Sequence, residues 1–142
     1  MEKQQSLLQR AWGYTDFVSR GDLDGIFSVL EPEPIFDLFP ISRRFIGKPR
    51  IKRYFTHFFS EVQPRIKGFK SRSELIGESS VGHEYDITVS MPNTSALSTH
   101  RVFALIIFGP DRLLGERIYS DEKMLRMLIG PLWNALEPIP AD

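Results

Sequence analysis

Four side chains in this sequence have the chemistry for proton transfer without a cofactor: Tyr14, His83, His100 and Asp121. A histidine changes its charge near neutral pH, a carboxylate can take up a proton, and a phenol can donate a hydrogen bond to a developing oxyanion. If such groups meet in the fold, they could transfer protons to and from a bound molecule. Whether they meet depends on the elements that carry them.

Asp121 lies where a strand pattern over residues 112–120 changes to a helix pattern. Met124, Leu125 and Leu128 recur at helical spacing, and Gly130 ends the helix. An aspartate at a helix start accepts hydrogen bonds from free backbone N–H groups, which stabilises the helix by about 1 kcal/mol. The sequence leaves open whether Asp121 only caps the helix or also transfers protons.

The two candidate histidines lie on strands whose alternation predicts their direction. In the strand over residues 81–91, His83 shares a face with Tyr85, and the intervening acidic residues take the other face. His100 begins the strand over residues 98–108 and is in phase with Ala104. On neighbouring strands both would face inward and could converge. The alternative for each is a structural histidine near a strand end, and His57 is expected on a solvated helix face.

Tyr14 lies on the apolar stripe of the first helix, with Leu7, Ala11 and Val18. A buried phenol needs a hydrogen-bond partner, either a polar side chain or a ligand. We therefore expect Tyr14 to donate to a group in the interior.

The remaining periodicities predict an α+β fold in which helices come first and antiparallel strands follow. Helices are expected at residues 7–20, 22–30, 47–62 and 122–130, a short strand at 35–39 before Pro40, and longer strands at 66–78, 81–91, 98–108 and 112–120. Residues 131–142 have no clear pattern. The sheet should curve over the helices.

The strand over residues 98–108 is apolar on both faces. Val102, Ala104 and Ile106 would face the helices. Little of the chain is left to cover the opposite face, which consists of Phe103, Leu105 and Ile107. A second subunit is the simplest cover, so we expect a homodimer through these three residues.

Composition sets limits on the other classes of function. The 142 residues are expected to form one domain, residues 1–142, with 18 basic and 18 acidic side chains and no cysteine. The basic segment at 41–55 places its charges opposite its apolar stripe, and a neutral chain does not favour nucleic acid or a membrane surface. The histidines are scattered, so we expect no metal and no cofactor. The polar N-terminus predicts a soluble cytoplasmic protein.

Three local patterns resemble the nuclear-transport-factor-2-like superfamily, which includes ketosteroid isomerase and the SnoaL-like polyketide cyclases. They are Tyr14 followed by Gly21-Asp22, the segment from Gly47 to Phe55, and the segment from Glu116 to Asp121 before the last helix. The resemblance implies a cone-shaped α+β barrel that encloses an apolar pocket and dimerises through its convex sheet face. The pocket residues that it implies for ligand binding are Leu38, Tyr54, Phe55, Phe59, Tyr85 and Ala104.

The catalytic residues of these relatives carry over only in part. The oxyanion-binding tyrosine of ketosteroid isomerase corresponds to Tyr14, but its two acidic positions fall on Leu38 and Ala104, so steroid isomerase chemistry is not expected. The cyclases use an aspartate that corresponds to Asp121. Their partner histidine falls on Ile107, and His100 lies farther back in the chain.

These observations predict a cofactor-independent acid/base enzyme that acts on a small apolar or polycyclic carbonyl compound. His83, His100 and Asp121 would be the acid/base candidates, and Tyr14 the hydrogen-bond donor. The alternative is a non-catalytic module of the same fold that binds a small ligand or serves for dimerisation.

Overall fold

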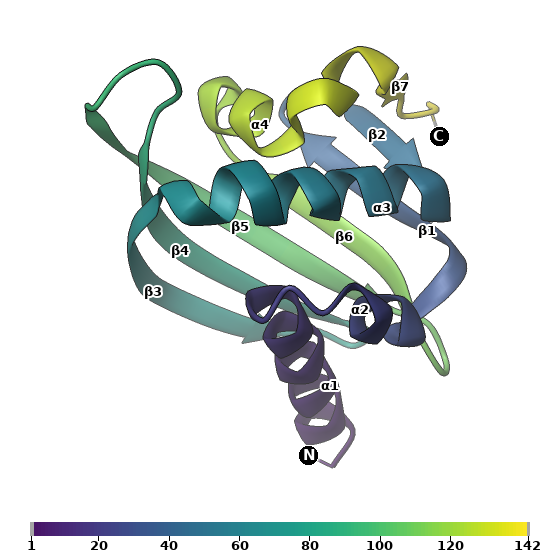
Figure 1. Ribbon diagram of the computed structural model, residues 1–142. Coiled ribbons are helices and arrows are strands. Elements are labelled where there is room, and N and C mark those ends of the chain that lie inside the picture. Colours follow the sequence, from purple (N-terminus) through teal and green to yellow (C-terminus); the bar gives the residue numbers. More distant parts are fainter. Residues whose placement is uncertain (1, 142) are drawn as a thin grey trace.

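The computed structural model describes residues 2–141, and it consists of a strongly curved sheet packed on helices (Figure 1). The helices are α1 (Glu2–Ser19), α2 (Leu23–Val29), α3 (Lys48–His57) and α4 (Glu122–Ile129). The strands are β1 (Leu30–Phe39), β2 (Arg43–Ile46), β3 (Ile66–Ile76), β4 (Ser80–Ser90), β5 (Leu97–Phe108), β6 (Leu113–Tyr119) and β7 (Glu137–Pro138). The predicted α+β class is confirmed.

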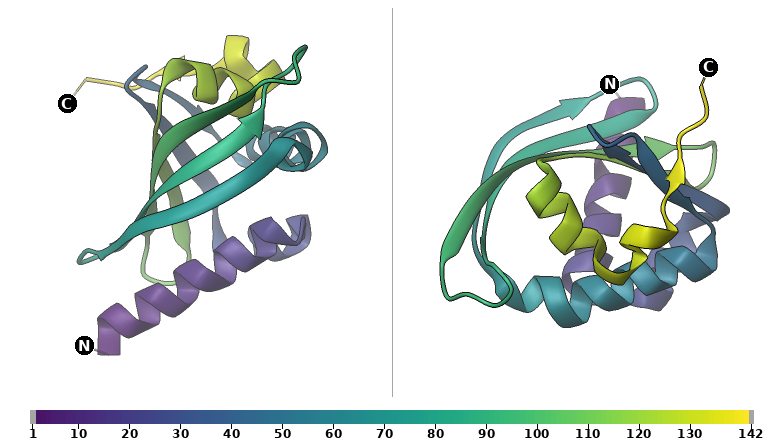
Figure 2. Two further views of the ribbon diagram at one scale, coloured as in Figure 1. Left: turned by 90° about the vertical axis from the view of Figure 1, so that its left-hand side faces the viewer. Right: turned by 90° about the horizontal axis from the view of Figure 1, so that it is seen from above.

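The seven strands form one sheet in the order β3-β4-β5-β6-β1-β2-β7. All neighbouring pairs are antiparallel except β1 and β6, which are parallel. The sheet curves around α3 and α4, while α1 crosses one end of the fold (Figure 2). In this arrangement the concave face of the sheet points toward the helices.

The helix starts follow the local sequence signals. Asp22 caps α2 by accepting a hydrogen bond from the Gly25 amide at 2.9 Å. Asp121 caps α4 in the same way, with 2.8 Å to the Met124 amide, so the predicted cap is confirmed. After α3 the chain continues in a wide π-helical turn (Phe58–Val62) and a short 3-10 turn (Gln63–Arg65).

The region after α2 differs from the prediction. The second helix ends at Val29, and β1 runs from Leu30 through the segment with Pro32 and Pro34, which was expected to be a break between helix and strand. The paired register with β6 jumps from Leu30 to Ile35, so both prolines lie where no ladder pair forms. A proline lacks the N–H that a ladder needs, and this irregular stretch accommodates it.

Two short strands were not predicted. Strand β2 pairs with β1, where Arg44 forms an ion pair with Asp37 at 2.8 Å, and β7 pairs with β2. Both are too short to show a period-two pattern. They form strands because a neighbouring strand is present to pair with them.

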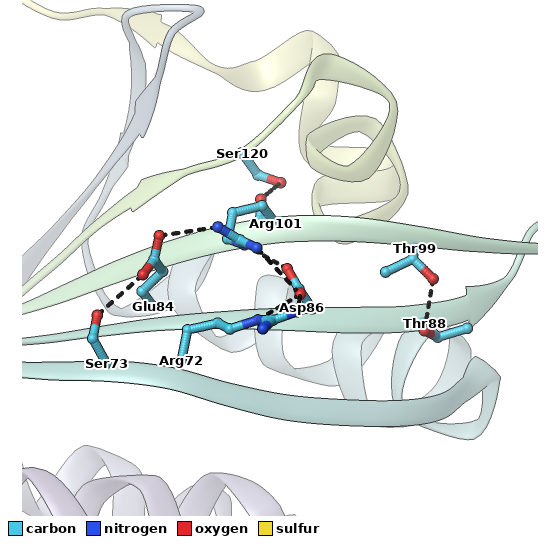
Figure 3. A network of polar contacts seen from close by, with 8 residues as sticks. All are labelled: Arg72, Ser73, Glu84, Asp86, Thr88, Thr99, Arg101 and Ser120. Carbon is cyan, nitrogen blue, oxygen red and sulfur yellow. Dashed lines mark hydrogen bonds and ion pairs between the residues drawn. The ribbon is translucent and has the colours of Figure 1, made fainter.

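The outer face of the sheet carries a connected polar network (Figure 3). Asp86 accepts hydrogen bonds from Arg101 and Arg72, while Glu84 accepts from Arg101 and Ser73. The two guanidinium groups lower the pKa of Asp86 to about 2. Because Glu84 and Asp86 lie on this face, their strand neighbours His83 and Tyr85 face the interior.

No helix within residues 2–141 is long and apolar enough to cross a membrane.

Candidate active site

A cavity of about 350 Å³ lies between the concave sheet face and helices α1 and α3. Most of its wall is aliphatic or aromatic. Its lining consists of Tyr14, Thr15, Val18, Tyr54, Phe55, Phe58, Phe69, His83, Tyr85, Ala104, Ile106, Glu116, Ile118 and Leu128. The cavity is large enough for a small organic molecule, and an apolar wall with a few polar groups is typical of ligand sites.

The most distinctive polar contact in this cavity joins α1 to β6. The Tyr14 hydroxyl donates a hydrogen bond of 2.6 Å to Oε2 of Glu116. Burial raises the pKa of Glu116 to about 7, although the bond from Tyr14 acts in the opposite direction. Burial and the neighbouring carboxylate raise the pKa of Tyr14 well above its usual value. At neutral pH, Glu116 can therefore both accept and release a proton while Tyr14 stays protonated.

Two further tyrosines share the cavity with Glu116. Burial raises the pKa of Tyr54 and of Tyr85, and the negative charge of Glu116 adds to the effect in both. Both phenols line the cavity, and neither hydroxyl finds a hydrogen-bond acceptor within residues 2–141. They remain available as donors to an oxygen atom of a bound molecule.

His83 and Tyr85 line the cavity, as the alternation along β4 predicts. Nε2 of His83 lies 2.8 Å from the hydroxyl oxygen of Ser71, and the imidazole lies 5.1 Å from the Tyr85 ring and 5.8 Å from the Phe69 ring, centre to centre. His83 therefore sits in the cavity wall with one ring nitrogen already engaged.

His100 also faces inward, but the two histidines do not converge. In the β4–β5 ladder His83 pairs with Ala104, and His100 pairs with Ile87. They are four positions apart along the ladder, which corresponds to about 13 Å. His100 instead contacts Asp121 at 2.6 Å between Nδ1 and Oδ2, and neither residue lines the cavity.

Asp121 therefore has a histidine partner, His100. The resemblance to the cyclases placed that partner at Ile107 instead. Burial would raise the pKa of Asp121, but the hydrogen bonds from His100 and from the Met124 amide outweigh burial and lower it. Asp121 combines the predicted cap with a buried imidazole contact, away from the cavity that holds Tyr14.

The remaining sequence candidates divide between cavity and core. Tyr54, Phe55, Tyr85 and Ala104 line the cavity. Leu38 and Phe59, expected as ligand contacts, do not: Leu38 is fully buried in the core, and the Phe59 ring stacks on that of Phe55 at 5.8 Å.

His57 was expected at the solvated surface of its helix, and this prediction was wrong. The imidazole is half-buried, because Nε2 lies 2.8 Å from the carbonyl oxygen of Met127 and the ring packs over Gly130. The contact with the end of α4 depends on tertiary packing, and helical periodicity does not reveal it.

Glu116 is the residue that the sequence reasoning missed as a site residue. Alternation along β6 places it in phase with Ile118, and both line the cavity. A carboxylate on the same strand face as a buried isoleucine is unusual, and this feature of the sequence could have identified Glu116 as a site residue.

Comparison with solved structures shows that the chain has the nuclear-transport-factor-2-like (NTF2-like) fold. A proposed isomerase from Rhodopseudomonas palustris is 15% identical, covers 85% of this chain and 96% of its own, and has a TM-score of 0.66. A proposed polyketide cyclase from Xanthomonas campestris is 14% identical over 90% of this chain and 99% of its own, with a TM-score of 0.66. An NTF2-like protein from Burkholderia xenovorans is 14% identical over 83% and 91%, with a TM-score of 0.67.

At these identities the likeness establishes the fold alone, since the same fold supports unrelated functions. No protein-family profile and no curated protein sequence matches the chain.

Proposed function

We propose that the protein is a cofactor-independent acid/base enzyme that isomerises, cyclises or dehydrates a small apolar carbonyl compound. The observation that carries this proposal is Glu116, a half-buried residue whose carboxylate faces an apolar cavity and has a pKa of about 7. A general base is most effective when its pKa lies near the working pH, and an ordinary surface glutamate does not meet this condition.

The geometry supports a division of roles. Ionised Glu116 removes a proton from the carbon next to the substrate carbonyl, and the negative charge moves to the carbonyl oxygen. The free hydroxyls of Tyr54 and Tyr85 donate hydrogen bonds to that oxygen. Glu116 then returns the proton to a different carbon, or the adjacent leaving group departs. Tyr14 holds the carboxylate in place, and His83 in the cavity wall would serve as a second proton donor.

The cavity also favours a class of substrate. Its volume of about 350 Å³ lies at the small end of the range for ligand sites. The lining residues, all within the described part of the chain, include no Lys or Arg, so an anionic substrate would meet Glu116 without a counter-charge. A neutral, largely apolar ketone fits these conditions.

The test is hydrogen–deuterium exchange at the carbon next to the carbonyl, followed by NMR in D₂O for a panel of neutral cyclic ketones. We expect the wild type to accelerate exchange, and Glu116→Gln to lose at least about 100-fold of the acceleration. Glu84→Gln, the same substitution on the outer sheet face, is the matched control and should behave as wild type.

Two results would contradict the proposal. Equal exchange by wild type and Glu116→Gln would remove Glu116 as the base. Ketones that raise the melting temperature of the wild type without any exchange would assign the cavity to a non-catalytic ligand-binding module, which is the competing function.

A further inference from the structure

A second chain of polar contacts lies on the concave sheet face, away from the cavity. The Ser98 hydroxyl oxygen is 2.7 Å from Nε2 of His100, and Nδ1 of the same imidazole is 2.6 Å from Oδ2 of Asp121. Both ring nitrogens are therefore engaged, one by a hydroxyl and the other by a carboxylate. With the ring hydrogen on Nδ1, the imidazole donates to Asp121 and accepts from Ser98.

The fold fixes all three groups. Ser98 and His100 are two positions apart on β5 and so share a face of the sheet. Asp121 follows β6 directly, and its second carboxylate oxygen is held by the Met124 amide at the start of α4. His100 is buried, with 6% of its side chain exposed, whereas 49% of the Asp121 side chain remains accessible. The imidazole cannot turn without breaking two hydrogen bonds.

We propose that Ser98, His100 and Asp121 form a second active site that performs acyl transfer, with Ser98 as the nucleophile. A hydroxyl bonded to an imidazole whose other nitrogen is held by a carboxylate is the arrangement of serine hydrolases, which is recognised by geometry and roles and recurs on unrelated folds. The site is distinct from the cavity, because its three residues are absent from the cavity lining and buried Val102 lies between His100 and Ala104 on that face. The proposal does not depend on the function of Glu116.

The surroundings indicate a small, uncharged ester with a short apolar acyl group. Directly paired residues of neighbouring strands share a face, so Val89 lies beside Ser98 and Ile87 beside His100. Both are buried, so the side chains that flank Ser98 and His100 on β4 are apolar. Ser98 itself is half-buried at the strand end, beside the exposed turn at residues 92–96, so part of its side chain is in contact with solvent.

The reaction balances without a co-reactant other than water. The Ser98 oxygen attacks the ester carbonyl carbon while its proton passes to Nε2 of His100. The ester C–O bond breaks, and the leaving alcohol takes that proton. Water, activated by the same nitrogen, then attacks the acyl-serine, releases the carboxylic acid and returns the proton to Ser98. The amides of Glu122 and Lys123 in the first turn of α4 have no acceptor within the helix, and they are the candidates to stabilise the oxyanion.

The experiment uses p-nitrophenyl acetate as the acyl donor and mass spectrometry of the whole chain and its peptides. Brief incubation should place one acetyl group on Ser98, and nitrophenol release should exceed the rate in buffer. Ser98→Ala should abolish the peptide label and reduce the nitrophenol release above the buffer rate at least about 100-fold. Glu116→Gln should leave both unchanged, which separates this site from the proposed carbonyl chemistry.

The chain supplies two matched controls. Ser71 is also bonded to an imidazole, at 2.8 Å from Nε2 of His83, but within residues 2–141 no carboxylate holds Nδ1 of that ring. We expect Ser71 to remain unlabelled. Asp121→Asn keeps a capping oxygen but removes the carboxylate from His100, so it should slow acetylation of Ser98 at least about tenfold. Asp22→Asn changes the equivalent cap of α2 and should have no effect on acetylation.

Labelling of lysines or histidines without Ser98 in the wild type would overturn the proposal, and this measurement requires no variant to fold. Acetylation of Ser98 at the same rate in wild type and Asp121→Asn would also overturn it, because the relay would then contribute nothing.

Discussion

The Tyr14 hydroxyl and the Glu116 carboxylate are 102 positions apart in the sequence and 2.6 Å apart in the fold. The bond joins the first helix to the strand that precedes the last helix, and it is made inside an apolar cavity. It explains the direction of Tyr14, because a buried phenol needs an acceptor. It also holds a carboxylate where burial alone would favour the neutral form.

The stability of the protein should depend on pH through Glu116. Its pKa rises from 4.5 to about 7 on folding, so between these values the folded state binds a proton that the unfolded state has released. Stability from this group is therefore lost as pH rises from 4.5 to 7 and is constant above that, with a total of about 3 kcal/mol. Urea unfolding of wild type and Glu116→Gln across this range measures the difference, because the glutamine variant lacks the titration.

Asp86 titrates in the opposite sense. Because its pKa is lowered on folding, Asp86 stabilises the protein above pH 3.8, and this stability is lost as pH falls toward 2. Wild type and Glu116→Gln share this effect, so it cancels when the two are compared. If the unfolding free energies of wild type and Glu116→Gln stay parallel from pH 4.5 to 7, Glu116 does not have the raised pKa.

Tyr14→Phe should change the pKa of Glu116 more than it changes the stability of helix α1, which carries Tyr14. The Tyr14 bond lowers the pKa of Glu116, so its loss should raise that pKa further. Above pH 7 the variant leaves a buried carboxylate without its donor, which should cost about 1–3 kcal/mol, and the cost should shrink at pH 5, where the group is neutral. Carbon-13 NMR of the Glu carboxyl groups reports the pKa, and urea unfolding at both pH values reports the cost.

Tyr119→Phe is the control, because that phenol is 38% exposed and stacks on Phe39 at the surface. It should change stability by less than about 0.5 kcal/mol at either pH. An equal cost for Tyr14→Phe at pH 5 and pH 8 would contradict a charge-dependent bond.

Long periodic segments could be predicted from the sequence because each carries its own pattern. The alternation along β4 placed His83 and Tyr85 inside, and the change of pattern at Asp121 placed the cap of α4 correctly. By contrast, β2 is four residues long and exists because β1 offers it a partner edge, which no local pattern encodes.

The candidate site was predicted in part for the same reason. Tyr14 was identified because a polar group on an apolar helix stripe is visible locally. The pairing of His100 with Asp121 arises from the β5–β6 register, which brings residues 21 positions apart into contact. The alternation along β6 places Glu116 on the inner face. Its contact with Tyr14 could not be predicted, because the two residues are 102 positions apart and no local pattern links them.

We propose a homodimer through the outer sheet face, where Phe103, Leu105 and Ile107 are half-buried in the single chain. Sedimentation at micromolar concentration should give about twice the chain mass of 16.4 kDa. Leu105→Glu should dissociate the dimer, because it places a charge in an apolar contact. Trp12→Gln, which removes a 51% exposed apolar side chain from α1, should leave the mass unchanged. A wild type that sediments as a monomer would exclude this interface.

Gly115 should be irreplaceable because it shapes the strand next to Glu116. Its φ of +148° is unfavourable for other residues, and a Cβ atom there would collide with the carbonyl oxygen of Ile35 on β1. Relief requires β1 and β6 to separate, so Gly115→Ala should destabilise the fold by about 2 kcal/mol or more and displace Glu116 from Tyr14. Gly13→Ala is the matched control, since nothing lies within 4 Å of its added Cβ on α1, and alanine should stabilise that helix by up to about 1 kcal/mol. Urea unfolding measures the change in stability of each variant, and carbon-13 NMR measures the pKa of Glu116. If Gly115→Ala is as stable as the wild type, the strands tolerate a side chain at this position and the prediction is wrong.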